Sequence, residues 1–247
     1  MTEMFQGAKL KIKRAEHHID DLQASVDALL KTDFHRLGIE HDQGINILKL
    51  ETKPLPDEIP LLIGDAVHNL RTALDHVAWE IVTKAGGVPT RWLSFPILET
   101  PEKVVAALNG QIKIAGADIV DSILNTIQPY KGGNNALWSL HQIDLVDKHR
   151  ILVPTVSVTS LFDVHAEDEN HNTFRAGSMT IGGDGVLRAF ATDAKLHIQS
   201  YGQATFAVLF QRGQAFEGEP VIPTLGQLVQ LVSGIIQTIE HAYLARS

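Results

Sequence analysis

The sequence of 247 residues contains no cysteine. Disulfide bonds, thiolate metal sites and a cysteine nucleophile are therefore excluded, and the composition fits a reducing, cytoplasmic location. No run approaches the roughly 18 consecutive apolar residues that a membrane-spanning helix needs. The polar N-terminal segment also lacks the apolar core of a signal peptide. We expect a soluble protein that has no membrane partner.

Positive charge is scarce as well. Lys and Arg number 21 against 29 Asp and Glu, which gives a formal net charge of −8 at pH 7. This balance argues against a broad nucleic-acid-binding surface, but it is compatible with a small basic pocket. A hydrophobic content of 44% with 20% charged residues is ordinary for a globular protein.

Apolar residues recur at helical spacing in several long segments. The first, 4–31, carries an unbroken seam from Phe5 to Leu29, which is typical of a helix bundle or a dimer. The others are 58–85, 134–150 and 224–245. We expect these helices to form a four-helix-bundle-like core. Because the first seam is longer than the other helices obviously cover, we also predict a homodimer.

After Arg150 the pattern changes to the alternation that is typical of strands. Gly44 to Thr52 is a further predicted strand, and 163–172 is predicted to be an acidic, solvated loop. The predicted class is therefore α+β. We expect a helical bundle region at 1–150, an inserted antiparallel β-sheet at 151–215, and a C-terminal helix at 216–247 that returns to the bundle.

The stretch from Ile63 to Trp79, IGDAVHNLRTALDHVAW, is rich in polar residues that are weak helix formers. Their density suggests that they have a function other than keeping the helix soluble. At about 100° per residue, they gather roughly opposite an apolar face. This polar strip holds Asp65, His68, Thr72, Asp75, His76 and Trp79. It is either a solvated face or a second, polar interface, and the large indole of Trp79 favours an interface.

A second polar strip lies on the helix at 134–150, which is otherwise apolar around most of its circumference. It consists of His141, Asp144 and Lys148. Since buried ionisable groups need partners, we expect this strip to meet the first one, with His68 or Asp75 within hydrogen-bonding reach. The contact would be either a functional site or a structural ion-pair network, because both perturb ionisation.

The spacing from Arg71 to His76, with Asn69 just upstream, resembles the Arg-x4-His signature of HEPN-type helical domains. Members of that family are helical bundles, and many are metal-independent ribonucleases of toxin–antitoxin and defence systems that act as dimers. The resemblance implies RNA as the substrate and no cofactor. It also implies that His76 acts as general acid or base, that Arg71 clamps the scissile phosphate, and that Asn69 or Asp75 orients the imidazole.

Two alternatives remain open at the level of the sequence. Asp65 with His68, and His141 with Asp144, are pairs at helical spacing of the kind that hold transition metals between helices. Lys148 and Arg71 would lie close to such an ion, so we predict that the purified protein carries no stoichiometric transition metal. The other alternative is a binding or assembly module whose polar strips only fix helix register.

Overall fold

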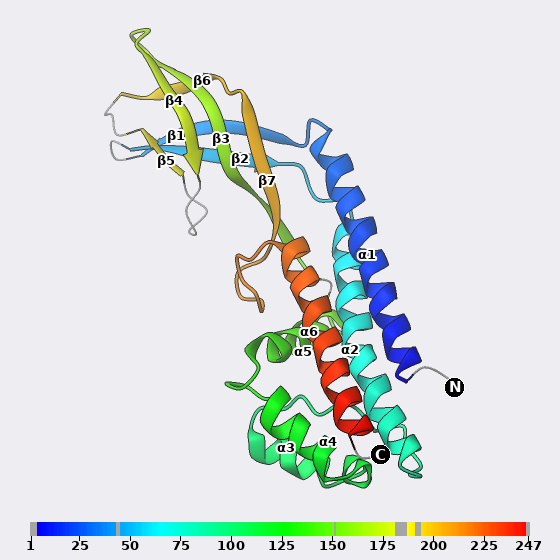
Figure 1. Cartoon of the computed structure of the whole chain (residues 1–247). Coiled ribbons are helices and arrows are strands. Elements are labelled where there is room, and N and C mark those ends of the chain that lie inside the picture. Colours follow the sequence, from blue (N-terminus) through cyan, green and yellow to red (C-terminus); the bar gives the residue numbers. More distant parts are fainter. Residues whose placement is uncertain (1–3, 43–44, 151, 181–186, 191–193, 246–247) are drawn as a thin grey trace.

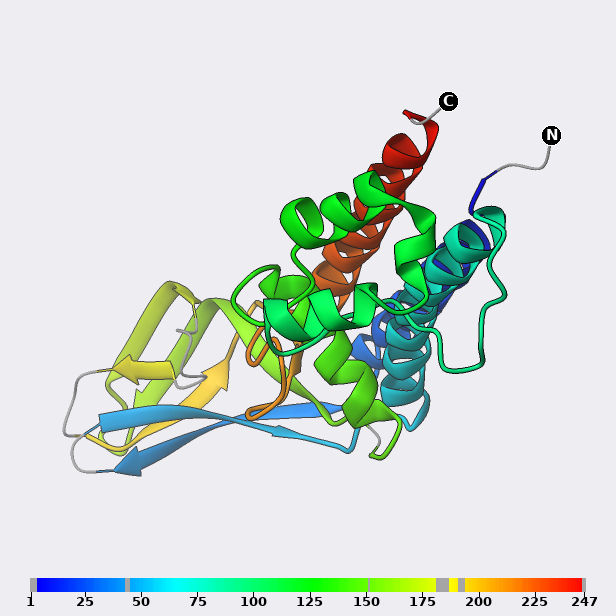
Figure 2. The same cartoon turned by 90° about the horizontal axis from the view of Figure 1, so that it is seen from below.

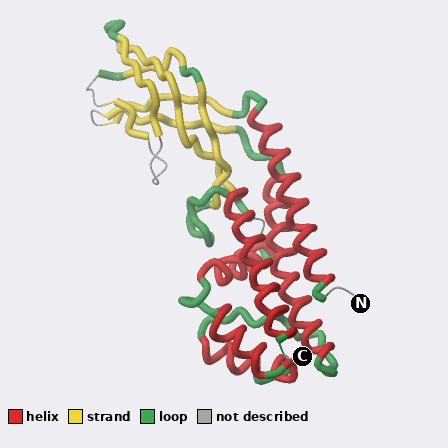
Figure 3. Tube along the Cα trace, viewed as in Figure 1, coloured by secondary structure: helices red, strands yellow, loops and turns green. Residues whose placement is uncertain are grey.

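The computed structural model describes residues 4–42, 45–150, 152–180, 187–190 and 194–245. The predicted α+β class is confirmed. Helices and strands are segregated at opposite ends of an elongated molecule (Figures 1 and 3). Each end has its own apolar core, and the larger core belongs to the helices.

Three long helices lie side by side at the helical end: α1 (Gln6–Leu30), α2 (Glu58–Lys84) and α6 (Val221–Leu244). α1 and α2 run antiparallel, since the Phe5 N–H at the start of α1 donates to Glu80 near the end of α2. The fourth predicted helix is α5 (Asn135–Asp147), which packs against α2 and α6. It is shorter than predicted, and Leu145 and Val146 are exposed rather than buried.

α6 is long and apolar enough to cross a membrane, judged by length and composition alone. Its apolar face, which includes Leu225, Val232 and Ile239, is buried in the helical core. The apolarity of this helix is thus used for packing against its neighbours.

Short helices connect α2 to α5 and cover one side of the long helices (Figure 2). They are α3 (Pro101–Leu108), a 3₁₀ turn at Ile112–Ala115, α4 (Ala117–Asp121) and a π-helical turn at Ser122–Ile127. Thr100 caps α3 by accepting a hydrogen bond from the Lys103 N–H, and Pro101 occupies the first turn, as the sequence predicts.

The strands form two antiparallel sheets where one was predicted. The first contains β1 (His35–Asp42), β2 (Ile45–Thr52) and β5 (Leu187–Phe190), in that order. In the second, β3 (Pro154–Asp168) pairs with β4 (Thr173–Thr180), β6 (Leu196–Ser200) and β7 (Gln203–Phe210). The β1–β2 hairpin lies between α1 and α2 in the chain, so the β region draws on residues from within 1–150. β1 was not predicted because its sequence, HRLGIEHD, shows no clear apolar alternation.

The predicted loop at 163–172 is wrong over its first half, because β3 continues to Asp168. Val164 and Ala166 are buried, while Asp163 and Glu167 occupy alternate positions that are partly exposed. Asp168 then stabilises the turn by accepting hydrogen bonds from the N–H groups of Asn170 and Asn172 at 2.8 and 2.9 Å.

A small second core joins the two sheets. Val158, Leu161 and Val164 of β3 pack against partly buried residues that include Ile39 of β1 and Phe206 of β7. The side chain of Asn46 adds a polar link, since its Oδ1 accepts a hydrogen bond from the Leu196 N–H at 3.1 Å.

Candidate functional site

The polar strips of α2 and α5 meet along the seam between these helices. Asp144 lies at its centre and is 1% exposed. It accepts hydrogen bonds from His68 Nδ1 at 3.0 Å and from Lys148 Nζ at 2.6 Å. The prediction that the two strips face each other is confirmed. Because a carboxylate this deeply buried needs partners, Asp144 fixes the positions of both side chains.

His68 presents its imidazole from this seam toward solvent, with 52% of the side chain exposed. Since the Nδ1–H donates to Asp144, the neutral ring carries a lone pair on Nε2, where the Thr72 hydroxyl lies at 3.4 Å. A buried carboxylate behind an accessible imidazole holds a histidine in the tautomer that can accept a proton.

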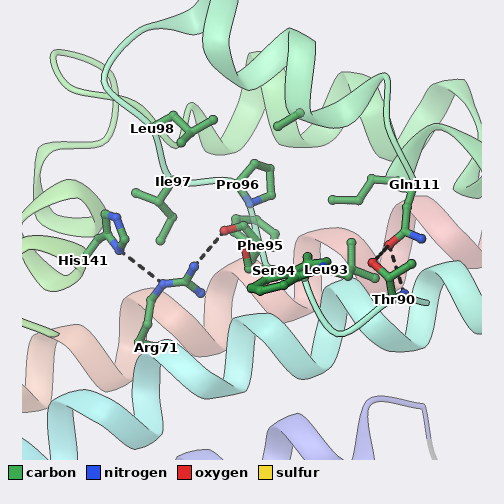
Figure 4. Close-up of a pocket in the computed structure, with 13 residues that line it drawn as sticks. Arg71, Thr90, Leu93, Ser94, Phe95, Pro96, Ile97, Leu98, Gln111 and His141 are labelled. Atoms are coloured by element: carbon green, nitrogen blue, oxygen red, sulfur yellow. Dashed lines mark hydrogen bonds between the residues drawn. The ribbon is translucent and has the colours of Figure 1, made fainter. Parts of the chain in front are cut away.

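Arg71 lies one turn further along α2 and is only 6% exposed. Its guanidinium donates from Nη1 to Asp75 at 2.6 Å, from Nη2 to the Phe95 carbonyl at 2.9 Å, and from Nε to His141 Nδ1 at 3.4 Å. Asp75 in turn accepts the Phe95 N–H at 2.8 Å. Arg71 therefore ties α2 to α5 and to the segment that precedes α3 (Figure 4).

His141 accepts the Arg71 hydrogen bond at Nδ1, so the neutral ring carries its proton on Nε2. Burial lowers the pKa of His141 below its ordinary value of 6.5, and the positive charge of Arg71 lowers it further. Asp144 opposes this shift only in part. His141 is consequently neutral at physiological pH and offers the Nε2–H as a donor.

Asp147 adds a carboxyl group at the end of the seam. Burial raises the pKa of Asp147 above 3.8, and the negative charges of Asp144 and Asp65 raise it further. This side chain packs directly on Gly64 of α2, where a Cβ atom would collide with the carboxylate oxygens. Gly64 therefore permits the close approach of α5 to α2.

A pocket of about 360 Å³ opens beside the seam. Arg71 and His141 line one end of it. At the other end, Gln111 Oε1 accepts hydrogen bonds from the Thr90 N–H and hydroxyl at 3.2 and 3.1 Å. Apolar residues line the space between the two ends: Leu93, Phe95, Pro96, Ile97, Leu98 and Ile112 (Figure 4). Mostly apolar walls with a few converging polar groups are typical of a ligand site.

Arg71 and His76 are not brought together within one chain. Residues five positions apart on a straight helix differ in direction by about 140°. His76 accordingly lies against α1, where a Cβ atom built on Gly7 would be 2.9 Å from its Nδ1. Arg71 instead faces α5, so the pair implied by the Arg-x4-His spacing does not form in the monomer.

Asn69 and Asp75 have partners other than His76 in the described residues. Asn69 Nδ2 donates to the Asp65 carbonyl at 2.8 Å, and its Oδ1 accepts from Lys11 Nζ at 3.4 Å. Asn69 thus links α2 to α1, whereas Asp75 holds Arg71 and the Phe95 backbone. On the seam between α2 and α5, the imidazole that a carboxylate holds is that of His68, through Asp144.

The ligand geometry does not support the metal alternative. Within the described ranges, no three His, Asp or Glu side chains are grouped so that they could hold a metal ion. Asp144 already binds Lys148 and His68, and His141 binds Arg71. The two cationic side chains would repel a metal ion at this position.

The chain matches no protein-family model, no curated protein and no solved structure. The seam and its pocket therefore carry the functional argument. Sequence reasoning missed the segment from Thr90 to Leu98 as part of the site, although its RWLSFPI motif was visible as an aromatic and proline-rich stretch. It missed Asp147 too, because the sequence does not reveal which side chain faces Gly64.

Proposed function

We propose that this protein is a metal-independent endoribonuclease whose general base is His68, held by Asp144. The observation that carries the proposal is the 3.0 Å hydrogen bond from His68 Nδ1 to a carboxylate that is almost fully buried. It supports a base role because it leaves the lone pair of Nε2 on the accessible side of the ring. The proposal keeps the ribonuclease activity that the HEPN resemblance implies but replaces His76 with His68.

In this reaction, the ribose 2′-hydroxyl of RNA attacks the adjacent phosphorus. His68 Nε2 takes the proton of that hydroxyl, the bond from phosphorus to the 5′ oxygen breaks, water protonates the leaving oxygen, and the hydroxide that remains takes the proton from His68. The products are a 2′,3′-cyclic phosphate and a 5′-hydroxyl end. Every bond change involves only RNA, His68 and water, so the step requires neither an oxidant nor a metal ion.

The remaining polar groups of the seam would support the charge that develops on the phosphate. His141 would donate its Nε2–H to a phosphate oxygen, since the Arg71 hydrogen bond keeps the proton on that nitrogen. Lys148 would supply a positive charge beside His68, because both bind the same carboxylate. Arg71 would act as a positioning residue through His141 rather than as the phosphate clamp.

The experiment is cleavage of a single-stranded RNA in the presence of EDTA by the wild type, His68→Gln and His76→Gln. We expect the wild type to cleave and His76→Gln to cleave at a similar rate. His68→Gln should lose about 100-fold or more in rate, which is the size of a general-base contribution. Because the glutamine amide can still donate a hydrogen bond to Asp144, the replacement should leave the melting temperature close to that of the wild type.

Loss of cleavage in His76→Gln with full activity in His68→Gln would return the active site to the Arg71–His76 motif. Absence of cleavage by the folded wild type on all RNA sequences tested would reject the ribonuclease assignment. The seam would then be a structural network that fixes the packing of α5 on α2.

A further inference from the structure

The pocket beside the seam has two polar ends and an apolar middle. Arg71 and His141 occupy the end nearest the proposed catalytic imidazole, and Thr90 with Gln111 occupies the far end (Figure 4). This arrangement suits a flat, largely apolar ring that carries hydrogen-bonding atoms at its edges. A nucleobase has this chemistry.

Trp92 belongs to the lining of this pocket and is nevertheless 78% exposed. Exposure of an indole to water costs free energy because the ring is large and mostly apolar. An indole that is this exposed beside a pocket therefore suggests a binding partner. The guanidinium of Arg91 lies over the ring, 4.5 Å from its centroid. This cation–π contact holds the indole in place and sets a positive charge beside it.

Building on the proposed ribonuclease function, we infer that Trp92 and this pocket bind one nucleobase of a single-stranded RNA substrate. The base stacks on Trp92, as bases do on aromatic side chains in RNA-binding proteins, and its edge reaches into the pocket. Arg91 lies beside the indole and complements a phosphate that flanks the base, while the buried Arg71 holds the pocket wall at Phe95. This would place a nucleotide next to the seam that carries His68.

The charges around the pocket are compatible with a polyanion despite the overall charge of −8. Lys113 is exposed and directly follows Ile112 of the pocket wall. Of the nearby acidic residues, Asp75 is paired with Arg71 and Glu99 with Lys103, while Glu102 is exposed. RNA binding at this site therefore needs only a local basic rim, which is what the composition allows.

The inference is tested by binding without cleavage. A fluorescently labelled, fully 2′-O-methylated RNA oligonucleotide lacks the attacking hydroxyl, so its anisotropy reports binding alone. We expect Trp92→Ala to weaken binding by about tenfold or more, as expected for the loss of one stacked base. Phe162→Ala is the matched control, because Phe162 is an exposed aromatic residue of β3 in the other half of the molecule. It should bind like the wild type.

Equal binding by Trp92→Ala and the wild type would overturn the inference, and so would an equal loss in Phe162→Ala.

Competition with AMP or UMP separates the two sources of the same base chemistry. Displacement by a mononucleotide that binds as tightly as the oligonucleotide would assign the pocket to a free nucleotide and overturn the RNA assignment. Trp92-dependent binding without cleavage of unmodified RNA would support the pocket and reject the proposed catalysis, whereas cleavage that is insensitive to Trp92→Ala would do the reverse.

Discussion

At the scale of single residues, the contacts of Arg71 are those of a residue that holds several parts of the structure together. Its three hydrogen-bonding nitrogens reach a side chain of its own helix, the backbone at Phe95 and the imidazole of His141. Because the guanidinium is only 6% exposed, its removal would leave its hydrogen-bond partners without a donor at a place that water hardly reaches. Arg71 is therefore a structural residue of the site, and its removal should be visible in stability.

We predict that Arg71→Ala lowers the free energy of unfolding by about 2–3 kcal/mol, since it removes a buried guanidinium, releases the partly exposed carboxylate of Asp75 and leaves the Phe95 carbonyl without its donor. Urea unfolding monitored by circular dichroism measures this change. Arg91→Ala is the control, because it removes an exposed arginine whose cation–π contact contributes only about 0.5–1 kcal/mol. Equal unfolding midpoints for both variants would contradict the role of Arg71 as a buried clamp.

At the scale of elements, the approach of α5 to α2 depends on the absence of a side chain at Gly64. A Cβ atom there would collide with the carboxylate of Asp147, whereas Cβ atoms on Gly226 and Gly234 of α6 meet nothing within 4 Å. Because these glycines lie in helices of comparable length, a change to alanine alters helix propensity to a similar extent in each. A difference in stability between the two alanine variants therefore reports close packing.

We predict that Gly226→Ala raises stability by about 0.4–1 kcal/mol, because alanine reduces the entropy of the unfolded chain. Gly64→Ala should be less stable than Gly226→Ala by about 1 kcal/mol, since the added methyl group displaces the partly buried carboxylate of Asp147. Thermal unfolding of the two variants side by side provides the comparison. A Gly64→Ala protein as stable as Gly226→Ala would show that the Asp147 carboxylate does not pack on Gly64 as described.

Some elements of the fold and of the site could be predicted from the sequence, and others could not. The long helices and the meeting of the strips were predictable, because periodicity and the need to pair buried charges both constrain them. β1 and the end of β3 were not, since their charged outward-facing residues hide the inward-facing ones. The sequence predicted that His68 or Asp75 contacts the polar strip on α5, but it did not identify Asp144 as the partner of His68. The pocket depends on a connecting segment that has no periodic pattern to read.

At the scale of the whole molecule, burial holds several imidazoles neutral. Burial lowers the pKa of His18 and of His35 below 6.5, although Asp65 opposes the shift at His18 and Asp33 opposes it at His35. Arg14, Asp21 and His17 also act on His18. Because the unfolded chain takes up protons that the folded chain does not, this stability is fully present above about pH 6.5 and is lost as the pH falls below it.

We predict that the urea midpoint decreases from about pH 7.5 to about pH 5.5, in the window where a histidine of ordinary pKa becomes charged. The raised pKa of Asp147 acts in the opposite sense, but it is one group against several imidazoles. His18→Gln should reduce the dependence. A midpoint that is constant over this range, or a steeper loss in His18→Gln, would contradict the prediction.

The homodimer was predicted from the length of the Phe5 to Leu29 seam, without an assignment of the paired surface, and we now propose exposed residues of α1 and α2 for it. Leu10 of α1 and Trp79 of α2 are large apolar side chains that are 57% and 46% exposed. We expect light scattering at micromolar concentration to give twice the chain mass of 27.1 kDa. Trp79→Glu should give a monomer because it buries a charge in the interface, while Trp92→Glu should remain a dimer. A wild-type mass equal to one chain would reject the dimer.

The most direct test of the central claim uses a DNA oligonucleotide that contains one ribonucleotide, incubated with EDTA and analysed by mass spectrometry. We predict cleavage only after that ribonucleotide, with a 2′,3′-cyclic phosphate end, and no reaction of the all-DNA strand. Asp144→Asn should slow the cleavage by about 100-fold or more, since the amide no longer fixes the proton-accepting tautomer of His68. An intact chimeric strand, or an Asp144→Asn protein as fast as the wild type, would contradict the assignment of His68 and Asp144 as the catalytic pair.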